Sequence, residues 1–181
     1  GDVKLENILL DSSFNHCELI DFGFARRFPR HALIREASGS LHYASPEIWA
    51  NRPHYGPTKD VFALGVCLYV MLTGCFPFPG QNAKEIFAQV ETQRVWMTKS
   101  MSPEVRHLLT GMLAYWPQDR MNLRQVYRHP WVKKYTHRIR PYGRIHFRKA
   151  ASSHSFDKHQ QSKHQSKHQP KRQSKQQPKQ Q

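Results

Sequence analysis

The first residues of the sequence place an acid, a basic residue and an amide at close and fixed spacing. Asp2, Lys4 and Asn7 form the pattern D-x-K-x-x-N, and Asp21-Phe22-Gly23 follows a short distance along the chain. A third motif, Ala44-Ser45-Pro46-Glu47, comes after both. Each motif alone is common by chance, but the ordered set, with a predicted β-hairpin between the first two, is specific. The set indicates a catalytic loop at the very start of the sequence.

Longer segments extend the same signature in the same order. They read DFGFARRF, GSLHYASPE, KDVFALGVCLYVMLTGCFPF, PQDRM and RHPW. With these segments, residues 1–132 resemble the C-terminal lobe of a eukaryotic serine/threonine protein kinase. The resemblance is greatest to the group related to the calcium/calmodulin-dependent and AMP-activated kinases. It implies a mainly α-helical large lobe with a short N-terminal β-hairpin, and an ATP- and Mg²⁺-dependent enzyme that acts on Ser or Thr of protein substrates.

The resemblance also assigns roles to the polar residues of these motifs. Transfer of the γ-phosphoryl group spreads negative charge over phosphate oxygens, so catalysis depends on positioning and electrostatic stabilisation. Asp2 would accept the proton of the substrate hydroxyl, and Lys4 would place its charge near the transferred phosphate. Asn7 and Asp21 would supply oxygen ligands to Mg²⁺. Ser40 would tie the substrate-docking loop to Asp2 and Lys4.

Other positions have supporting roles by the same resemblance. Glu47 and Arg120 would form a buried ion pair that holds the segment after the activation loop. Asp60 would be a capping acceptor that anchors the backbone of the catalytic loop, although its sequence context also fits a plain surface N-cap. Leu9 would lie at the nucleotide site, and both Leu9 and Phe22 are predicted to be core residues.

The hydropathy pattern predicts the elements that position these residues. Residues 8–10 and 17–20 are short apolar or alternating runs joined by a polar turn, which predicts a β-hairpin. Residues 24–57 lack sustained periodicity and predict a long functional loop. The following run, residues 60–74, is apolar on nearly every face and ends at a glycine, which is typical of a buried helix.

The rest of the globular part is predicted to be helical. Residues 82–92 place apolar side chains on one stripe, and residues 102–113 do the same after a Ser-Pro start that is typical of a helix N-terminus. A last short helix is predicted near residues 122–131. Two short strands and about four helices make the predicted domain mainly α.

The formal charge of +15 is concentrated at the end of the chain. Residues 1–131 hold 14 Lys and Arg against 12 Asp and Glu, whereas residues 132–181 hold 14 against a single acid, Asp157. The front part therefore has the charge balance of an ordinary globular domain. We predict a kinase large lobe over residues 1–135 and a separate basic tail over residues 136–181.

The predicted tail has a composition of its own. From residue 161 it repeats Gln-(Ser/Pro)-Lys-x five times, and residues 157–181 have no aliphatic or aromatic side chain. Such a segment cannot bury enough apolar surface to offset its ordering entropy, so disorder is predicted. Its regular lysines could bind polyanions weakly through counterion release, although a solvated extension without a partner is the simpler interpretation of the composition.

Cysteine usage and hydropathy bear on the compartment. The three cysteines, Cys17, Cys67 and Cys75, are an odd number without paired spacing, which argues against a disulfide framework and favours a reducing compartment. Cys67 lies in an apolar run and is predicted to be a small core residue. Residues 61–72, the longest apolar run, are too short to span a bilayer. We expect an intracellular, cytoplasmic protein without membrane association, with a nuclear location as the alternative.

The sequence departs from the kinase pattern at two places. Gly1 precedes the catalytic aspartate where the family has His-Arg, and Glu36 stands where relatives carry a phosphorylatable Thr. Either activation-loop phosphorylation does not switch this chain, or these positions have drifted. The glycine-rich loop and strand lysine of the small lobe are also absent from the sequence. We therefore expect a fragment of a longer kinase, inactive by itself.

A second class of function competes with the enzyme. The chain could be a pseudokinase or a docking scaffold whose helical face binds partners. The presence of all four phosphotransfer side chains, Asp2, Lys4, Asn7 and Asp21, favours the enzyme, because a decayed site usually loses at least one. An intact glycine-rich loop and strand lysine in the upstream reading frame would discriminate between the two.

Overall fold

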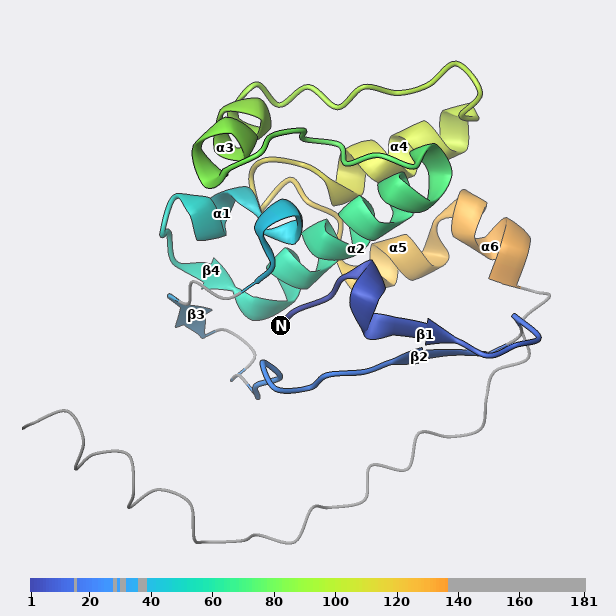
Figure 1. The fold of residues 1–181 in the computed structure, drawn as a ribbon, viewed down its shortest axis with the longest axis horizontal. Helices are drawn as coiled ribbons and strands as arrows, with labels where there is room; N and C mark the ends of the chain where they lie inside the picture. The colour runs from blue at the N-terminus through green and yellow to red at the C-terminus, as the bar shows by residue number, and fades with distance from the viewer. Residues whose placement is uncertain (15, 28, 30–31, 36–38, 137–181) are drawn as a thin grey trace, which may run out of the picture. The chain divides into compact units, whose positions relative to one another are not determined.

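Helix α2, Gly56–Thr73, runs through the middle of the computed structural model and packs along α4, Pro103–Met112 (Figure 1). Its side chains are buried on most faces, as the continuous apolar run predicted, and Cys67 lies in the core. The helix begins at Gly56, four residues before the predicted start. Pro57 is compatible with this first turn, because N–H groups there have no acceptor within the helix and proline has no N–H. It ends at Gly74, whose φ of 75° is the left-handed conformation that glycine adopts without strain.

The structure describes residues 1–14, 16–27, 29, 32–35 and 39–136, which belong to one structural unit. Glu36 and the predicted tail beyond Thr136 lie outside the described residues, so the expectations for them stay predictions. None of the helices in these ranges has the length and hydropathy needed to cross a bilayer.

The catalytic-loop motif leads into the predicted hairpin. The short 3₁₀ turn η1, Leu5–Asn7, is followed by β1, Ile8–Leu10, which pairs antiparallel with β2, Cys17–Leu19. The second strand ends one residue before the predicted limit. Ile20 nevertheless stays beside the first motif, because its N–H donates to the carbonyl of Asn7 over 2.8 Å.

The stretch predicted as a long loop contains a second, small sheet. Strand β3, Leu33–Ile34, pairs antiparallel with β4, His54–Tyr55. Between them lie the 3₁₀ turn η2, Leu41–Tyr43, and the short helix α1, Pro46–Trp49. Strands of two residues are too short to show alternation in hydropathy, and their partners are far apart in the sequence, so periodicity could not reveal them.

The remaining helices are close to their predicted limits. Helix α3, Ala83–Glu91, is capped by the side chain of Asn82, and α4 is capped by Ser102 as predicted. The single helix predicted near residues 122–131 is in fact two, α5 (Leu123–Arg128) and α6 (Pro130–Thr136). The break lies at the residue before Pro130, because proline disfavours helical backbone in the residue that precedes it.

Candidate active site

Asp2, Lys4 and Ser40 form one hydrogen-bonded group, as the resemblance implied. Oδ2 of Asp2 lies 2.7 Å from Nζ of Lys4. Oδ1 of Asp2 accepts from both the N–H and the O–H of Ser40, each over 3.0 Å, and Nζ of Lys4 donates to the Ser40 hydroxyl over 2.9 Å. Ser40 lies directly before η2, so this group joins the catalytic loop to the segment that leads into α1.

The surroundings of Asp2 favour its charged form. Burial alone would raise the pKa of this carboxyl group, but the hydrogen bonds from Lys4 and Ser40 outweigh burial and hold the pKa below its ordinary value. The hydrogen bond to Asp2 in turn raises the pKa of Lys4. Near neutral pH the group therefore consists of a carboxylate and an ammonium, with a hydroxyl between them.

Asn7 and Asp21 lie at the two ends of the hairpin, Asn7 directly before β1 and Asp21 two residues after β2. The side-chain N–H of Asn7 donates to the carbonyl of Asp2 over 2.9 Å, which leaves its side-chain oxygen as an acceptor. The neighbour of Asp21, Ile20, is bonded to the backbone of Asn7. Asp21 itself has a φ of 58°, and its Oδ1 accepts from the N–H of Gly23 over 3.0 Å. A carboxylate and an amide oxygen fit the oxygen-only preference of Mg²⁺, which keeps its other positions for water and phosphate.

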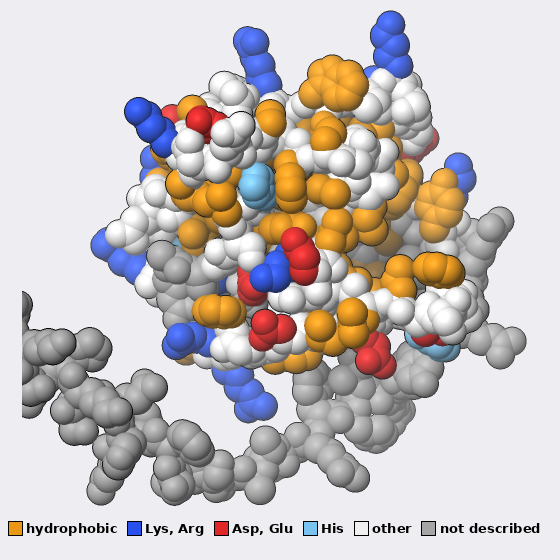
Figure 2. All heavy atoms as spheres, in the orientation of Figure 1, with side chains coloured by type: hydrophobic (Ala, Val, Ile, Leu, Met, Phe, Trp, Pro, Cys, Tyr) orange, Lys and Arg blue, Asp and Glu red, His pale blue; other side chains and the backbone are white. Residues whose placement is uncertain are grey.

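Asp2 and Asp21 line the same cleft. It has a volume of about 340 Å³ and lies between the catalytic loop, the residues after β2 and the first turn of α2. Figure 2 shows acidic side chains gathered around a basic one near the start of the chain, next to hydrophobic side chains of the hairpin. The two aspartates predicted to share one substrate site therefore do face a common space.

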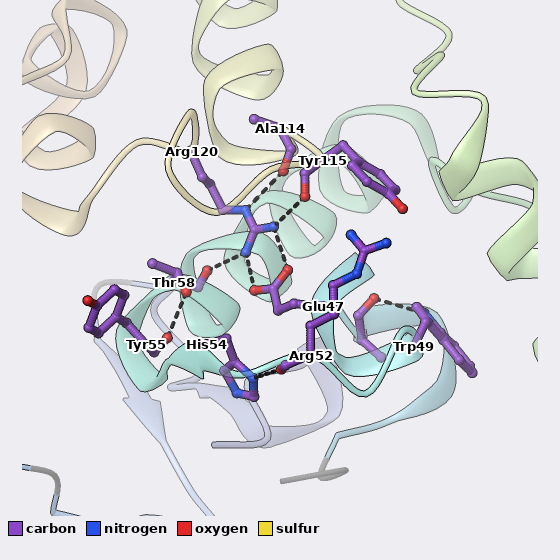
Figure 3. Close-up of polar contacts among 10 residues, drawn as sticks. Glu47, Trp49, Arg52, His54, Tyr55, Thr58, Ala114, Tyr115 and Arg120 are labelled. Carbon is purple, nitrogen blue, oxygen red and sulfur yellow. Dashed lines mark hydrogen bonds and ion pairs between the residues drawn. The ribbon is translucent and has the colours of Figure 1, made fainter. Parts of the chain in front are cut away.

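Glu47 and Arg120 form a bidentate ion pair that joins α1 to the segment after α4 (Figure 3). The two guanidinium nitrogens of Arg120 lie 2.7 and 2.8 Å from the carboxylate oxygens, and both residues are almost completely buried. Arg120 also donates to the carbonyls of Thr58, Ala114 and Tyr115. Burial opposes ionisation of Glu47, but Arg120 outweighs it and holds the pKa of Glu47 below its ordinary value.

Asp60 lies beside the backbone of the catalytic loop and is not the N-cap of α2. Because α2 starts at Gly56, Asp60 is inside the first turns of the helix, and the capping position belongs to Tyr55. Its Oδ1 lies 3.6 Å from the backbone nitrogen of Gly1. The side chain therefore faces the backbone of the catalytic loop, where the resemblance places it, and does not cap α2.

Leu9 and Phe22 are not core residues, contrary to the prediction. Leu9 is 52% exposed and Phe22 is 66% exposed. Large hydrophobic side chains of the same region are exposed with them, namely Leu10, Phe14, Leu19, Ile20 and Phe24. The hydropathy of these residues suggested burial, but the described residues leave the hairpin and the segment after it largely uncovered. We call these seven exposed side chains the hairpin face.

One residue of the site could not be found from sequence motifs. The ring of His42, two residues after Ser40, stacks on Phe76 with centroids 4.2 Å apart, and its Nε2 lies 3.2 Å from the carbonyl of Gly80. Tyr43 donates to the carboxylate of Glu6 over 3.1 Å. These contacts hold the Ser40 segment against the loop after α2 and against the catalytic loop. Their partners are more than thirty positions away, so no local signal marks them.

Comparison with known proteins agrees with this geometry. Residues 1–132 match the protein kinase domain family. The chain belongs to the protein kinase family. It is similar to the probable serine/threonine-protein kinase HSL1 of Saccharomyces cerevisiae, with 37% identity over 134 residues, which are 74% of this chain and 9% of that protein. It is also 38% identical over 133 residues to the probable serine/threonine-protein kinase KIN1 homolog of Encephalitozoon cuniculi, covering 74% of this chain and 23% of that protein.

Further relatives point to the same group of kinases. The probable serine/threonine-protein kinase MARK-A of Dictyostelium discoideum is 34% identical over 131 residues, which are 72% of the kinase chain and 12% of that protein. The kinase chain spans between 9% and 31% of the length of seven relatives compared with it. The match therefore establishes a serine/threonine kinase relationship for residues 1–132, within the group related to AMP-activated kinases.

Proposed function

We propose that this chain supplies the large lobe of a protein serine/threonine kinase, which transfers the γ-phosphoryl group of ATP to Ser or Thr hydroxyls of proteins. The observation that carries the proposal is the bonded group of Asp2, Lys4 and Ser40 at a cleft that Asp21 also lines. A structural or docking role does not require these four polar side chains to converge. Their convergence favours the enzyme over a pseudokinase scaffold.

In this proposal Asp2 receives the substrate hydroxyl. Its ionised carboxylate accepts hydrogen bonds only, so it orients the hydroxyl and takes up the proton as the oxygen attacks phosphorus. Lys4, fixed by Asp2 and Ser40, places a positive charge where negative charge develops on the transferred group. Ser40 belongs to the segment that would hold the substrate chain, so binding of a substrate and alignment of Asp2 are coupled through one hydroxyl group.

The residues present also fit the expected cofactors. Asn7 and Asp21 would hold Mg²⁺ through one amide oxygen and one carboxylate, and the cleft beside them would take the phosphates of ATP. When bound, Mg²⁺ neutralises the charge of the phosphate oxygens. Leu9 and Phe22 on the hairpin face would contact the adenine side of the nucleotide or the protein layer that covers it. Their exposure supports this, because such a contact is missing among the described residues.

We further propose that the 181-residue polypeptide does not catalyse phosphoryl transfer by itself. The described residues include the proposed proton acceptor and metal ligands, but the large hydrophobic side chains of the hairpin face are exposed and would need a covering layer around a bound nucleotide. The cations that line the cleft are Arg26 and Lys59, and neither lies on a glycine-rich loop. ATP would then lack the contacts that hold its α- and β-phosphates in line.

A complementation experiment tests both proposals. The chain is assayed with radiolabelled ATP and a Ser/Thr peptide library, alone and joined to the small lobe of a related kinase. We expect transfer only in the joined protein, with Asp2→Asn reducing kcat by at least about 10²-fold. Normal turnover by the joined Asp2→Asn variant would disprove the assignment of Asp2, and Asp2-dependent transfer by the chain alone would disprove the inactivity.

We also propose an intracellular location and a polyanion-binding role for the basic tail. The three cysteines form no disulfide, and the buried thiol of Cys67 has its pKa raised to about 12 by burial, which supports an intracellular, reducing location. The basic tail would add salt-sensitive affinity for polyanions. Comparison of the full chain with a version ending at Thr136, at two salt concentrations, tests the tail, and equal binding by both would exclude it.

A further inference from the structure

Two histidines outside the active site are in direct contact between α4 and α6. Nδ1 of His107, on α4, lies 2.9 Å from Nε2 of His129, which is the residue between α5 and α6. Their rings stack with centroids 5.1 Å apart and planes inclined by 19°. His129 is only 6% exposed. Neither residue takes part in the proposed phosphotransfer, so this contact needs an explanation of its own.

The hydrogen bonds define which ring nitrogens carry protons. The backbone N–H of Trp131 donates to Nδ1 of His129 over 3.3 Å, so this ring nitrogen is the acceptor and carries no hydrogen. The proton of a neutral His129 ring is then on Nε2, where it donates to Nδ1 of His107. Nδ1 of His107 is therefore also bare, and its proton lies on Nε2. The arrangement is consistent only when both rings are neutral.

His129 also caps α6. Its carbonyl accepts from the N–H of Lys133 over 2.9 Å, and its ring accepts from the second residue of the helix, as the side chain of an N-cap residue does. Asn, Asp, Ser and Thr caps keep their acceptor oxygen at any pH near neutrality. An imidazole keeps its acceptor only while it is neutral, because imidazolium has a hydrogen on both nitrogens.

We propose that His107 and His129 form a pH-sensitive latch that holds α6 against α4 when neutral and releases it when a proton is taken up. A proton on Nδ1 of His129 meets the N–H of Trp131 and removes the cap. A proton on Nδ1 of His107 meets the Nε2–H of His129 and separates the two helices. The first protonation removes the cap of α6, and the second breaks the contact between α6 and α4, beside which Trp131 and Val132 pack near Leu108.

The neighbouring charges do little to stabilise a protonated pair. The one acid on α4 is Glu104, which acts on His129 and also interacts with Lys134. The other charged side chains of the packed helices are Arg106 on α4, Arg124 and Arg128 on α5, Lys133 and Lys134 on α6, and Lys59 and Asp60 in the first turns of α2. On α4, α5 and α6 the positive charges outnumber the single acid.

The surroundings of His129 favour its neutral form, as the hydrogen bonds of its ring also require. Burial, followed by the charge of His107, lowers the pKa of His129 below its ordinary value of 6.5, against a weaker effect of Glu104. The unfolded chain therefore binds a proton more readily than the folded chain. The stabilisation is complete above about pH 6.5 and is lost as the pH falls through the lowered pKa of the folded state.

Hydrogen exchange of the full chain tests the latch. Exchange is measured at about pH 7.5 and about pH 5.5, on either side of the ordinary histidine pKa, and corrected for the intrinsic pH dependence. We expect the protection of α6 amides to fall by about tenfold at the lower pH relative to α2 amides, the size of effect that loss of a cap causes. Equal protection of α6 at the two pH values would overturn the proposal.

Substitutions separate the latch from general acid sensitivity. His129→Asn keeps a capping oxygen that does not titrate, so α6 protection should become the same at both pH values. His16→Asn, in the exposed hairpin turn, should keep the wild-type response. A pH-dependent loss of α6 protection in His129→Asn as large as in the wild type would contradict the latch.

A spectroscopic measurement on the wild type needs no substitution. Long-range ¹H–¹⁵N correlation spectra distinguish a ring protonated at Nε2 from one protonated at Nδ1. We expect His129 to be the Nε2–H tautomer at about pH 7.5. An Nδ1–H tautomer or an imidazolium at this pH would rule out the capping arrangement.

Discussion

Ser40 and Asp2 are 38 positions apart in the sequence, yet the N–H and the O–H of Ser40 both donate to the same carboxylate oxygen of Asp2. Lys4 completes the group by contacting both residues. A carboxylate with this many donors is rigidly oriented, and its orientation depends on a segment far from the catalytic loop. The contact thus couples the site of proton transfer to the segment proposed to bind the substrate.

Removal of the Ser40 hydroxyl should loosen Asp2. Ser40→Ala eliminates one donor to Asp2 and one acceptor for Lys4, whereas Ser40→Thr retains both. In the isolated chain, NMR titration should show the pKa of Asp2 higher in Ser40→Ala than in the wild type. In a domain completed with a small lobe, kcat should fall by about tenfold, because a hydrogen bond to a charged group contributes about 1.5–3 kcal/mol. An unchanged Asp2 pKa in Ser40→Ala would show that the hydroxyl contact does not matter.

Breaking the Glu47–Arg120 pair should be strongly destabilising. Arg120→Met leaves a buried carboxylate and three carbonyls without their donor, and should lower the free energy of unfolding by about 3–5 kcal/mol in urea titrations. Arg120→Lys should recover little of this loss, because an ammonium cannot reproduce the bidentate fork. If Arg120→Lys were as stable as the wild type, the bidentate geometry would not be the source of the stability.

The same pair should make stability depend on acidity. The folded-state pKa of Glu47 is lowered from 4.5, so its contribution is complete above about pH 4.5 and is lost as the pH falls through the lowered value. Thermal unfolding between about pH 3 and about pH 6 should show a steeper acid-induced decline for the wild type than for Glu47→Gln. Parallel curves for the two proteins would refute this linkage.

Substitution by alanine should destabilise the fold to different extents at two glycines in packed helices, Gly65 and Gly111. A Cβ on Gly65 would lie 2.9 Å from Cβ of Met112, which cannot move without the backbone of α4. Gly65→Ala should therefore destabilise by about 1–3 kcal/mol, although alanine normally improves a helix. A Cβ on Gly111 would meet mainly the flexible end of Met121, at 2.6 Å from Cε. Gly111→Ala should lower the free energy of unfolding by less than Gly65→Ala does, and denaturant titrations of both variants measure the difference.

The hairpin face should make the isolated chain self-associate. Phe22→Ser and Leu9→Ser remove exposed hydrophobic surface without taking a side chain out of the core. Both should reduce concentration-dependent association in sedimentation velocity, with little change in thermal stability. Val66→Ser, in the core, is the matched control and should lower thermal stability instead. Unchanged association of the Phe22→Ser variant would show that the hairpin face does not mediate self-association.

Local sequence patterns determined most of the elements. The uninterrupted apolar run predicted a buried α2 and its stop at Gly74, and the Ser-Pro start predicted the N-terminus of α4. These features depend on residues within one or two turns of each other, where backbone preferences and capping bonds act. The hairpin β1–β2 was predictable for the same reason. The chemistry of Asp2, Lys4, Asn7 and Asp21 was indicated by type and spacing.

Tertiary structure alone decided which of these residues meet and which side chains are covered. Pairing of β3 with β4, the contact of His42 with Phe76 and the His107–His129 pair join segments far apart in the chain, and no local pattern encodes such contacts. Hydropathy likewise predicted burial of Leu9 and Phe22, although both are exposed. The physical reason is that hydropathy measures the gain available when a side chain is covered, whereas actual burial depends on whether another surface lies against it.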